Sequence, residues 1–304
     1  MANVLPRGKQ IEVLHHLVEG NTLRSTSRLT GVHRTSMMKL LVAFGEGCQK
    51  LMDNRFKDLT LEHLEVDEIW TFVRKKQSRL TVDEKAERHD IGDIYLWTAI
   101  DQETKLVPAF VVGKRTGDSA RKLMRQLASR LTFPNPHDSD NHLFEKGEYT
   151  PVTQISTDML AAYPEAVDQF FGPYARYGQL KKEYRNAAMQ YTPSEMVGTE
   201  RKSIFGIDPE KLWSICTSHV ELHNLTIRTL MKRFTRLNLG FSKKLDNLVA
   251  ACQVFLAYYN FVWRTRCDDK SGQRGQLRPP AAMMAGVTNT LWDFERLYDE
   301  AMAA

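Results

Sequence analysis

The segment Val66-Asp-Glu-Ile-Trp-Thr-Phe-Val73 gives the clearest indication of a β-sheet in the central part of the chain. Its side chains alternate as they do on a β-strand, which puts Val66, Glu68, Trp70 and Phe72 on one side. Two more strand-like segments follow at residues 93–100 and 106–112, and the polar turn 101–105 joins them. The length and composition of this turn predict a β-hairpin.

Farther along the chain, helical and strand-like patterns alternate. The pattern predicts a helix over 118–131, a short strand over 152–157 that ends at Asp158, a helix over 162–171 and a fifth strand over 174–180. Strong helical patterns cover 217–236 and 244–264, and a short one covers 291–302. The segments between these elements are predicted to be irregular, and they are the charged loop 74–90, the polar loop 134–150 and the charge-rich stretch 181–216.

The order of these elements predicts an α/β fold. Three antiparallel strands, then helix, strand, helix, strand and a final helix is the order of a ribonuclease-H-like core. We therefore expect a ribonuclease-H-like catalytic domain with a mixed sheet over residues 64–266. An all-α domain precedes it, and residues 267–304 form a C-terminal tail with a short helix.

Residues 1–57 differ from the rest in charge. Nine Lys and Arg side chains stand against four acidic ones, so this segment has a net charge of +5, equal to that of the whole chain. Apolar residues recur at helical spacing up to Val18, and Gly20 and Asn21 interrupt them. A short helix over 22–29, a glycine-bearing turn and a third helix over 33–44 complete the outline of a helix-turn-helix DNA-binding domain.

In a helix-turn-helix, the second helix crosses the DNA backbone and the start of the third enters the major groove. The third helix here opens with donors that can reach phosphates or base edges. The alternative is a plain three-helix packing module with a solvated basic face. The residues expected to contact DNA from this domain are Arg24, Arg28, His33, Arg34, Thr35, Ser36 and Lys39.

The composition is that of a globular protein without a membrane partner. Of 304 residues, 42% are hydrophobic and 26% charged, and 42 Lys and Arg against 37 Asp and Glu weakly favour a polyanionic partner. The chain has neither the roughly 18 consecutive apolar residues of a membrane span nor a signal peptide at its start. Its four cysteines form no CxxC pair, so we expect reduced thiols and a cytoplasmic location; they are Cys48, Cys216, Cys252 and Cys267.

Three acidic residues fall where this element order makes them candidates for catalysis. Asp67 lies in the first strand, Asp158 ends the fourth strand 91 residues later, and Glu221 opens a long helix 63 residues further on. In such a core the first and fourth strands are neighbours and the late helix packs across them, so the three carboxylates can converge. Carboxylate oxygens suit Mg²⁺ or Mn²⁺, and two such ions can serve hydrolysis or transesterification of a phosphodiester.

Each acid also has a structural interpretation. Asp67 could be a strand-edge charge, Asp158 a helix N-cap and Glu221 a first-turn acid favoured by the helix dipole. Asp101 ends the second strand and is a rival candidate, but its position in a tight polar turn indicates a turn residue.

The neighbours of these acids are interpreted from their periodicity. Glu68 should point to the face opposite Asp67, so only one of the two can face the site, whereas Glu65 should share the side of Asp67. His219 and His223 flank the acid of the late helix, but two residues away on either side they point off its face. We therefore do not expect either histidine to be a metal ligand.

The surroundings of Glu221 favour a functional role. Asn224 and Arg228 follow it by three and seven residues, on the same face of a helix. A basic run comes next, which is either a solvated face or a surface that holds phosphates. The cations of this run expected to contact DNA are Lys232, Arg233, Arg236, Lys243 and Lys244.

Several motifs in the right order resemble a known family. The stretch Thr217-Ser-His-Val-Glu-Leu-His-Asn-Leu-Thr-Ile-Arg228 and the later Tyr258-Tyr-Asn-Phe261 are similar to the C-terminal half of DDE transposases of small bacterial insertion sequences. The nearest group is the one named after the first-described insertion sequence. Val66-Asp-Glu-Ile-Trp70 and Ile155-Ser-Thr-Asp158 resemble the segments around that family's first two acids. Leu277-Arg-Pro-Pro-Ala-Ala-Met-Met-Ala-Gly286 resembles its closing segment, so the likeness covers about residues 64–287.

The resemblance implies that Asp67, Asp158 and Glu221 bind two Mg²⁺ (or Mn²⁺) ions, with Asn224 and Arg228 as accessory residues near the scissile phosphate. It implies a transposase that binds double-stranded DNA at element ends and target, as a homodimer or higher oligomer, at the nucleoid in the bacterial cytoplasm. The chain lacks the Cys-rich zinc motif of some members, and residues 267–276 form a longer insertion than the family pattern suggests. Two alternatives are a catalytically inactive DNA-binding regulator and a nuclease of the same fold without strand transfer.

Overall fold

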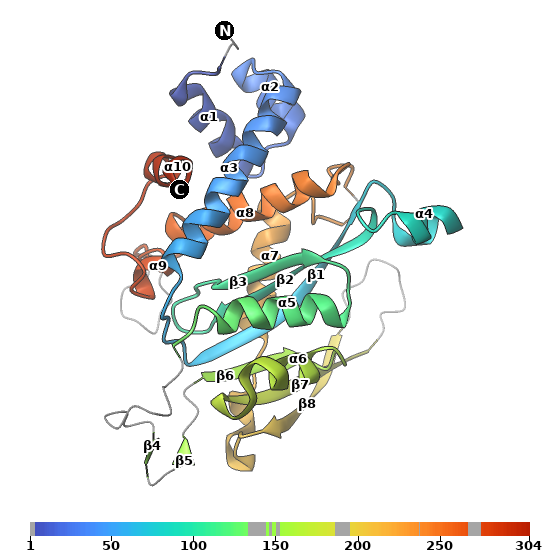
Figure 1. Cartoon of the computed structure of the whole chain (residues 1–304), viewed down its shortest axis with the longest axis vertical. Helices are drawn as coiled ribbons and strands as arrows, with labels where there is room; N and C mark the ends of the chain where they lie inside the picture. The colour runs from blue at the N-terminus through green and yellow to red at the C-terminus, as the bar shows by residue number, and fades with distance from the viewer. Residues whose placement is uncertain are drawn as a thin grey trace.

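A six-stranded mixed sheet with helices on both faces forms the centre of the molecule, so the fold is α/β (Figure 1). The computed structural model describes residues 4–132, 144–145, 148–149, 153–185, 195–236, 238–266 and 275–304. The predicted polar loop 134–150 and the insertion 267–276 lie mostly outside these residues. A small separate pair of strands consists of β4 (Phe144–Glu145) and β5 (Glu148–Tyr149).

The strands of the main sheet follow the order β3-β2-β1-β6-β7-β8. The first three strands, β1 (His63–Val73), β2 (Gly92–Asp101) and β3 (Ala109–Gly113), form an antiparallel meander, as the hairpin pattern predicts. β6 (Thr153–Asp158) runs parallel to β1 and to β7 (Ala175–Arg185). The prediction that the first and fourth strands of the core are neighbours is therefore confirmed.

The prediction that residues 181–216 are irregular is wrong for the residues that the structure describes. β7 continues to Arg185, β8 (Glu195–Phe205) pairs with it antiparallel, and the 3₁₀ helix η3 (Pro209–Ser214) follows. Residues 198–205 are all exposed or half-buried, because β8 lies at the edge of the sheet. An edge strand that buries so little surface does not need alternating apolar and polar residues. The sequence of β8 therefore lacks the alternation that predicts a strand.

The charged segment 74–90 also contains short helices that its composition concealed. They are η1 (Gln77–Arg79) and α4 (Val82–Glu87). A capping box begins α4, in which the side chains of Thr81 and Glu84 each accept a hydrogen bond from the backbone N–H of the other residue.

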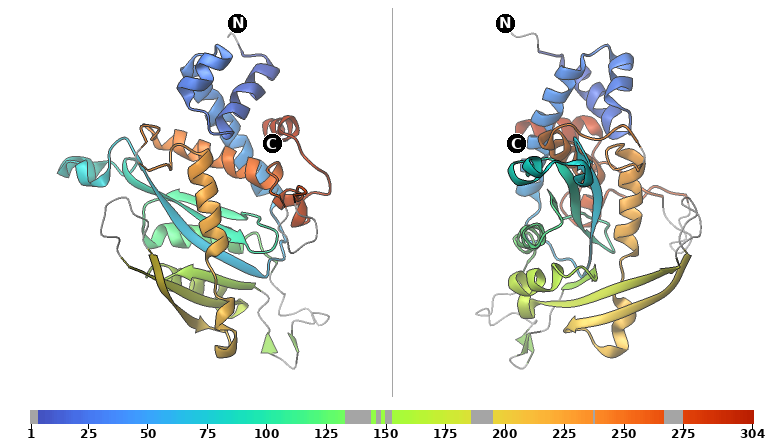
Figure 2. Two further views of the ribbon diagram at one scale, coloured as in Figure 1. Left: turned by 180° about the vertical axis from the view of Figure 1, so that it is seen from behind. Right: turned by 90° about the vertical axis from the view of Figure 1, so that its right-hand side faces the viewer.

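Helices cover the two faces of the sheet separately (Figure 2). α5 (Gly117–Ala128) and α6 (Tyr163–Phe171) lie on one face, and η2 (Gly172–Tyr174) follows α6. α7 (Ser218–Leu230) stands against the other face, in contact with β1 and β2. The helix was predicted to reach residue 236, but it ends six residues earlier, where Met231 is extended and the chain turns back to bury Met231 and Phe234.

Three helices form the N-terminal part of the chain, namely α1 (Arg7–Val18), α2 (Leu23–Thr30) and α3 (Arg34–Arg55). The Thr22 side chain caps α2 by accepting a hydrogen bond from the N–H of Ser25, and Gly31 ends it in the left-handed region at φ +72°. α3 continues well beyond Phe44, where the third helix was predicted to end.

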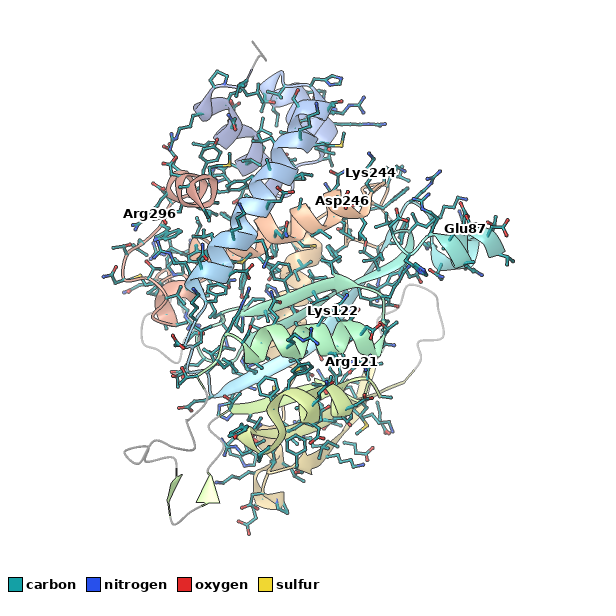
Figure 3. All side chains as sticks on the ribbon, in the orientation of Figure 1. Glu87, Arg121, Lys122, Lys244, Asp246 and Arg296 are labelled. Atoms are coloured by element: carbon teal, nitrogen blue, oxygen red, sulfur yellow. The ribbon has the colours of Figure 1, made fainter. Side chains whose placement is uncertain are left out.

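Three helices lie in the C-terminal part of the chain, namely α8 (Leu245–Phe261), α9 (Ala281–Met284) and α10 (Phe294–Ala303). α8 and α10 pack against α3, which therefore links the two ends of the chain, and α9 packs against α8. Lys244 and Asp246 lie at the start of α8, and Arg296 lies on α10 (Figure 3). Arg7 pairs with Asp299 at 2.7 Å, and Arg55 pairs with Glu300 at 2.9 Å. These ion pairs join α10 to α1 and α3, and α10 corresponds to the short helix predicted over 291–302.

The buried apolar side chains form a core that runs from the N-terminal helices into the sheet. Within the described residues, no helix combines the length and the apolar character required to cross a membrane. Cys48, Cys216 and Cys252 are free thiols, and Cys267 lies outside the described part of the chain.

Candidate active site

Two of the predicted acids lie where β1 and β6 separate. The parallel pairing of these strands ends at Val66 and Thr157, and the next residue on each strand is Asp67 and Asp158. One carboxylate oxygen from each of Asp67, Glu68 and Asp158 lies within 4.8 Å of the others. The gap between the diverging strands therefore gathers three acidic side chains.

The presence of Glu68 in this group corrects the prediction that only one of Asp67 and Glu68 can face the site. Because β1 has no hydrogen-bonded neighbour on this side beyond Val66, side chains from both of its faces can reach the gap. Glu68 is buried, and its carboxylate accepts hydrogen bonds from Tyr163 Oη at 2.8 Å and from Arg115 Nε at 2.7 Å.

Glu221 lines the same pocket but stands apart from the other acids. The pocket has a volume of about 480 Å³, and Asp67, Asp158 and Glu221 all line it. Glu221 does not belong to the group within 4.8 Å; instead it forms an ion pair with Lys182 and accepts a hydrogen bond from Thr217 Oγ1 at 3.0 Å. The three predicted metal ligands thus share one pocket, with Glu221 at its wall.

The acids in this pocket repel one another. Burial raises the pKa of Asp67 to about 7, and the charges of Glu68, Asp158 and Glu221 add to the effect. Burial and the charge of Asp158 also raise the pKa of Glu68. Arg115 offsets part of this excess, since its Nη2 lies 3.9 Å from Asp158 while its Nε is bonded to Glu68.

The donor set of the cluster fits hard divalent cations. It consists of carboxylate oxygens, which Mg²⁺ and Mn²⁺ prefer as ligands. Asp67, Glu68 and Asp158 are close enough to share an ion, and a bound cation would relieve the repulsion that raises the pKa of Asp67. Glu221 could contribute if its ion pair with Lys182 opened.

Glu65 holds the start of α7 against β1. Its fully buried carboxylate accepts hydrogen bonds from the backbone N–H groups of His219 at 2.8 Å and Val220 at 2.9 Å, and from His219 Nδ1 at 2.7 Å. These hydrogen bonds outweigh burial and lower the pKa of Glu65. Glu65 shares the α7 side of β1 with Asp67, as predicted. Glu65, Cys216 and His219 form a second cluster of ligand-type atoms, which sequence spacing alone did not indicate.

Asn224 and Arg228 project from α7 toward the acids. Asn224 Nδ2 donates a hydrogen bond to Asp67 Oδ2 at 2.8 Å. Arg228 is half-buried, and its charge interacts with those of Asp67 and Arg236; burial and then Arg236 lower its pKa. His223 packs against α8, with its ring centroid 4.4 Å from that of Tyr259.

Asp101 is a turn residue, as predicted. Its Oδ2 accepts hydrogen bonds from the backbone N–H of Thr104 at 2.8 Å and from the hydroxyl group of Thr104 at 2.7 Å. These bonds stabilise the connection between β2 and β3, and Asp101 does not belong to the group of Asp67, Glu68 and Asp158.

Most of the predicted DNA-contacting residues are accessible. The N-terminal set is exposed on α2, at the cap of α3 and along its first turns, and comprises Arg24, Arg28, His33, Arg34, Thr35, Ser36 and Lys39. Of the basic run, Arg236, Lys243 and Lys244 are exposed, whereas Lys232 and Arg233 are half-buried. Arg233 Nη1 donates a hydrogen bond to Ser242 Oγ at 2.6 Å.

Neither the protein-family models nor the curated proteins with which the chain was compared match it.

Proposed function

We propose that this chain is a DNA transposase of the DDE type. It would bind the ends of an insertion sequence and catalyse metal-dependent strand cleavage and strand transfer. The observation that carries the proposal is the convergence of Asp67, Glu68 and Asp158 at the gap between β1 and β6, with Glu221 on the wall of the same pocket.

The architecture supports this proposal. An antiparallel β1–β2–β3 meander beside parallel β6 and β7, with helices on both faces, is compatible with a ribonuclease-H-like core. α1, α2 and α3, with Gly31 at the turn before α3, are compatible with a helix-turn-helix. The exposed cations at the start of α3 are suited to contacts with phosphates and base edges.

The residues of the pocket have distinct roles in this proposal. Asp67, Asp158 and Glu221 would hold two Mg²⁺ or Mn²⁺ ions, and Glu68 joins them as a further candidate ligand. When bound, such ions activate the attacking oxygen and stabilise the leaving oxygen of a phosphodiester. Asn224 orients the Asp67 carboxylate through their hydrogen bond. Arg228 supplies positive charge beside the place where a phosphate would lie.

Double-stranded DNA is the proposed partner, both as element ends and as target. Two ends must be held together before they are joined, so we propose that the chain acts as a homodimer or higher oligomer in the bacterial cytoplasm, at the nucleoid.

A cleavage assay on labelled element-end DNA with Mg²⁺ tests the proposal. The flanking DNA identifies the substrate, because short inverted repeats should bracket the gene. Strand-transfer products are expected. Nicks without joining would indicate a nuclease of the same fold, and a mobility shift without cleavage would indicate an inactive DNA-binding regulator; either result overturns the proposal.

The matched variant in this assay is Asp158→Ala. Its side chain lines the acid pocket at the end of β6, far along the chain from the predicted DNA-binding helices. Cleavage should be abolished while binding to element ends is largely kept. Loss of binding together with cleavage would contradict the role assigned to Asp158.

A further inference from the structure

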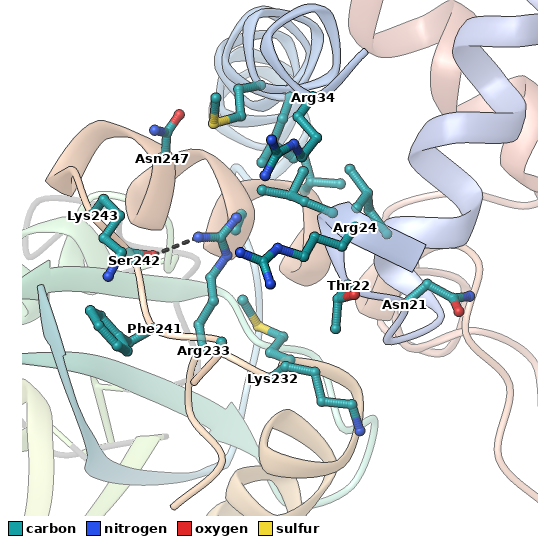
Figure 4. Close-up of a pocket in the computed structure, with 18 of the residues that line it drawn as sticks. Asn21, Thr22, Arg24, Arg34, Lys232, Arg233, Phe241, Ser242, Lys243 and Asn247 are labelled. Atoms are coloured by element: carbon teal, nitrogen blue, oxygen red, sulfur yellow. Dashed lines mark hydrogen bonds between the residues drawn. The ribbon is translucent and has the colours of Figure 1, made fainter. Parts of the chain in front are cut away.

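A second hollow lies between the N-terminal helices and the segment that follows α7 (Figure 4). Its volume is about 800 Å³. One wall comes from the end of α1, the turn before α2 and the start of α3; the other comes from residues 230–233 and 238–243 and from α8. We call it the interdomain groove.

Several arginine and lysine side chains line the interdomain groove. The guanidinium groups of Arg24, Arg34 and Arg233 point into the same space from three different segments (Figure 4). Lys232 and Lys243 also line it, and the lining residues include no Asp or Glu. Like charges gathered in this way repel one another, and an anion among them would remove that repulsion.

Arg233 is the cation least compensated by its surroundings. Burial lowers the pKa of its guanidinium, and the hydrogen bond that it donates goes to the neutral hydroxyl of Ser242. Among the described residues, no carboxylate forms an ion pair with Arg233. A half-buried cation without an opposite charge beside it is unfavourable, so an anionic ligand would offset a cost already present in the fold.

Part of the remaining lining is apolar and suits a base. It includes Leu17, Leu23, Met38, Leu230, Leu239 and Phe255. Pockets of roughly 300–1,000 Å³ hold ligands of small-molecule size, so this groove matches one or two nucleotides and is too small for a duplex. Grooves that hold single strands combine cations for the phosphates with apolar or aromatic surfaces for the bases.

The interdomain groove and the acid pocket are lined by opposite ends of α7. Thr217 and Glu221 line the acid pocket, and Leu230 lines the groove. Leu230 follows Glu221 by nine positions, roughly 14 Å along the helix axis. Arg228 lies between these two positions on α7, so a strand of a few nucleotides could follow positive charge from one site to the other.

We propose that the interdomain groove binds an unpaired segment of the DNA strand whose phosphodiester lies in the acid pocket. The phosphates contact Arg24, Arg34 and Arg233, and a base packs on the apolar lining. This inference rests on the proposed function, because it takes the strand to be a substrate of the acid pocket.

The test measures binding of the full-length protein in EDTA, which prevents cleavage, by fluorescence anisotropy. The probes are a labelled eight-nucleotide thymidine strand and an abasic strand of the same length and phosphate count. The thymidine strand should bind at least tenfold more tightly, because each stacked base contributes to affinity. Arg24→Ala and Arg34→Ala should each weaken its binding about tenfold. Equal binding of the two strands would refute the base site.

Both arginines are exposed, and neither forms an ion pair within the described part of the chain, so these variants should fold. Lys122→Ala is the matched control, since Lys122 is an exposed cation on α5, on the face of the sheet away from α7 (Figure 3). If Lys122→Ala weakens binding as much as Arg24→Ala does, the groove has no special role and the inference fails.

The experiments distinguish a failure of this inference from a failure of the proposed function. Asp158→Ala should keep the preference for the thymidine strand over the abasic strand, because Asp158 lines only the acid pocket of the two. If wild-type protein cuts and joins element ends but does not prefer the thymidine strand, only the inference is overturned. If it prefers that strand but never cleaves, the proposed function is overturned.

Discussion

Asn224 and Asp67 are 157 positions apart in the chain, yet Asn224 Nδ2 donates a 2.8 Å hydrogen bond to Asp67 Oδ2. The bond joins the middle of α7 to β1 at the point where β1 leaves β6. It restrains the direction in which the Asp67 carboxylate faces. In the proposed function, Asn224 is therefore a positioning residue.

Asn224→Ala should reduce Mg²⁺-dependent cleavage about 10- to 100-fold, as is usual when a group that orients a metal ligand is lost. The measurement is the cleavage rate as a function of Mg²⁺ concentration, where the variant should need more Mg²⁺ to reach half its maximum rate. Leu222→Ala, an exposed position on the same helix, is the control and should behave as wild type. An unchanged Mg²⁺ dependence in Asn224→Ala would remove the positioning role.

Glu68→Gln should weaken Mn²⁺ binding by about tenfold or more, because it removes one negative charge from the cluster at nearly constant shape. Titration of Mn²⁺ into the full-length protein measures this directly. Glu62→Gln, five residues before the cluster begins and exposed, serves as the control. Equal affinities for Glu68→Gln and wild type would show that Glu68 is only a structural partner of Arg115 and Tyr163.

Asp67 should make the metal-free protein less stable as the pH rises. Its pKa is about 7 in the fold against an ordinary 3.8, so the folded state holds this proton more tightly than the unfolded state. The free energy of unfolding therefore falls between about pH 4 and pH 7. In EDTA, Asp67→Asn should be more stable than wild type at pH 8 by on the order of a few kcal/mol and nearly equal to it at pH 4.

Denaturation by urea at several pH values, with and without Mg²⁺, measures this difference. Added Mg²⁺ should stabilise the wild type more than the variant, because it compensates the same repulsion. Parallel curves for the two proteins across this pH range would contradict the assignment.

His223 should make the fold sensitive to acid. Burial lowers its pKa to about 3 from 6.5, and within the described residues neither ring nitrogen has a hydrogen-bond partner. The unfolded chain takes up this proton first, so stability is lost as the pH falls from about 6.5 toward 3. His223→Leu should gain on the order of 2–3 kcal/mol over wild type at pH 4.5 and less at pH 7. Thermal unfolding at both values tests this, with the exposed His89→Gln as a control that should show no such gain.

Gly45 should tolerate no side chain, because α3 crosses α8 there. A Cβ at this position would lie 2.8 Å from Ala250 Cα, so Gly45→Ala should destabilise the fold by about 1–3 kcal/mol despite the better helix propensity of alanine. At Gly8 in α1 nothing lies within 4 Å of an added Cβ, and Gly8→Ala should stabilise by about 0.5–1 kcal/mol. Changes of the same sign in both variants would contradict the close crossing.

Local patterns predicted most of the regular structure because each pattern reflects burial on one face. The alternation of residues 66–73 corresponds to β1, and the helical spacing at 118–131 and 162–171 corresponds to α5 and α6. The same reasoning fails for β8, whose charged residues form an edge strand with almost no buried face. Pattern reasoning also predicted that the third helix ends too early. Glycine disfavours a helix, and the sequence does not show that Gly45 and Gly47 lie against α8 and α10, where a side chain would not fit.

The candidate acids and the order of the helices and strands can be predicted from the sequence, because strand and helix periodicity depend on residues only a few positions apart. How those acids meet depends on contacts across 90 residues and more. The parting of β1 from β6 admits Glu68 to the cluster, and the pairing with Lys182 holds Glu221 at the pocket wall. Such distances are decided by how sheet and helix pack together, because packing selects one of many arrangements that satisfy the same local pattern.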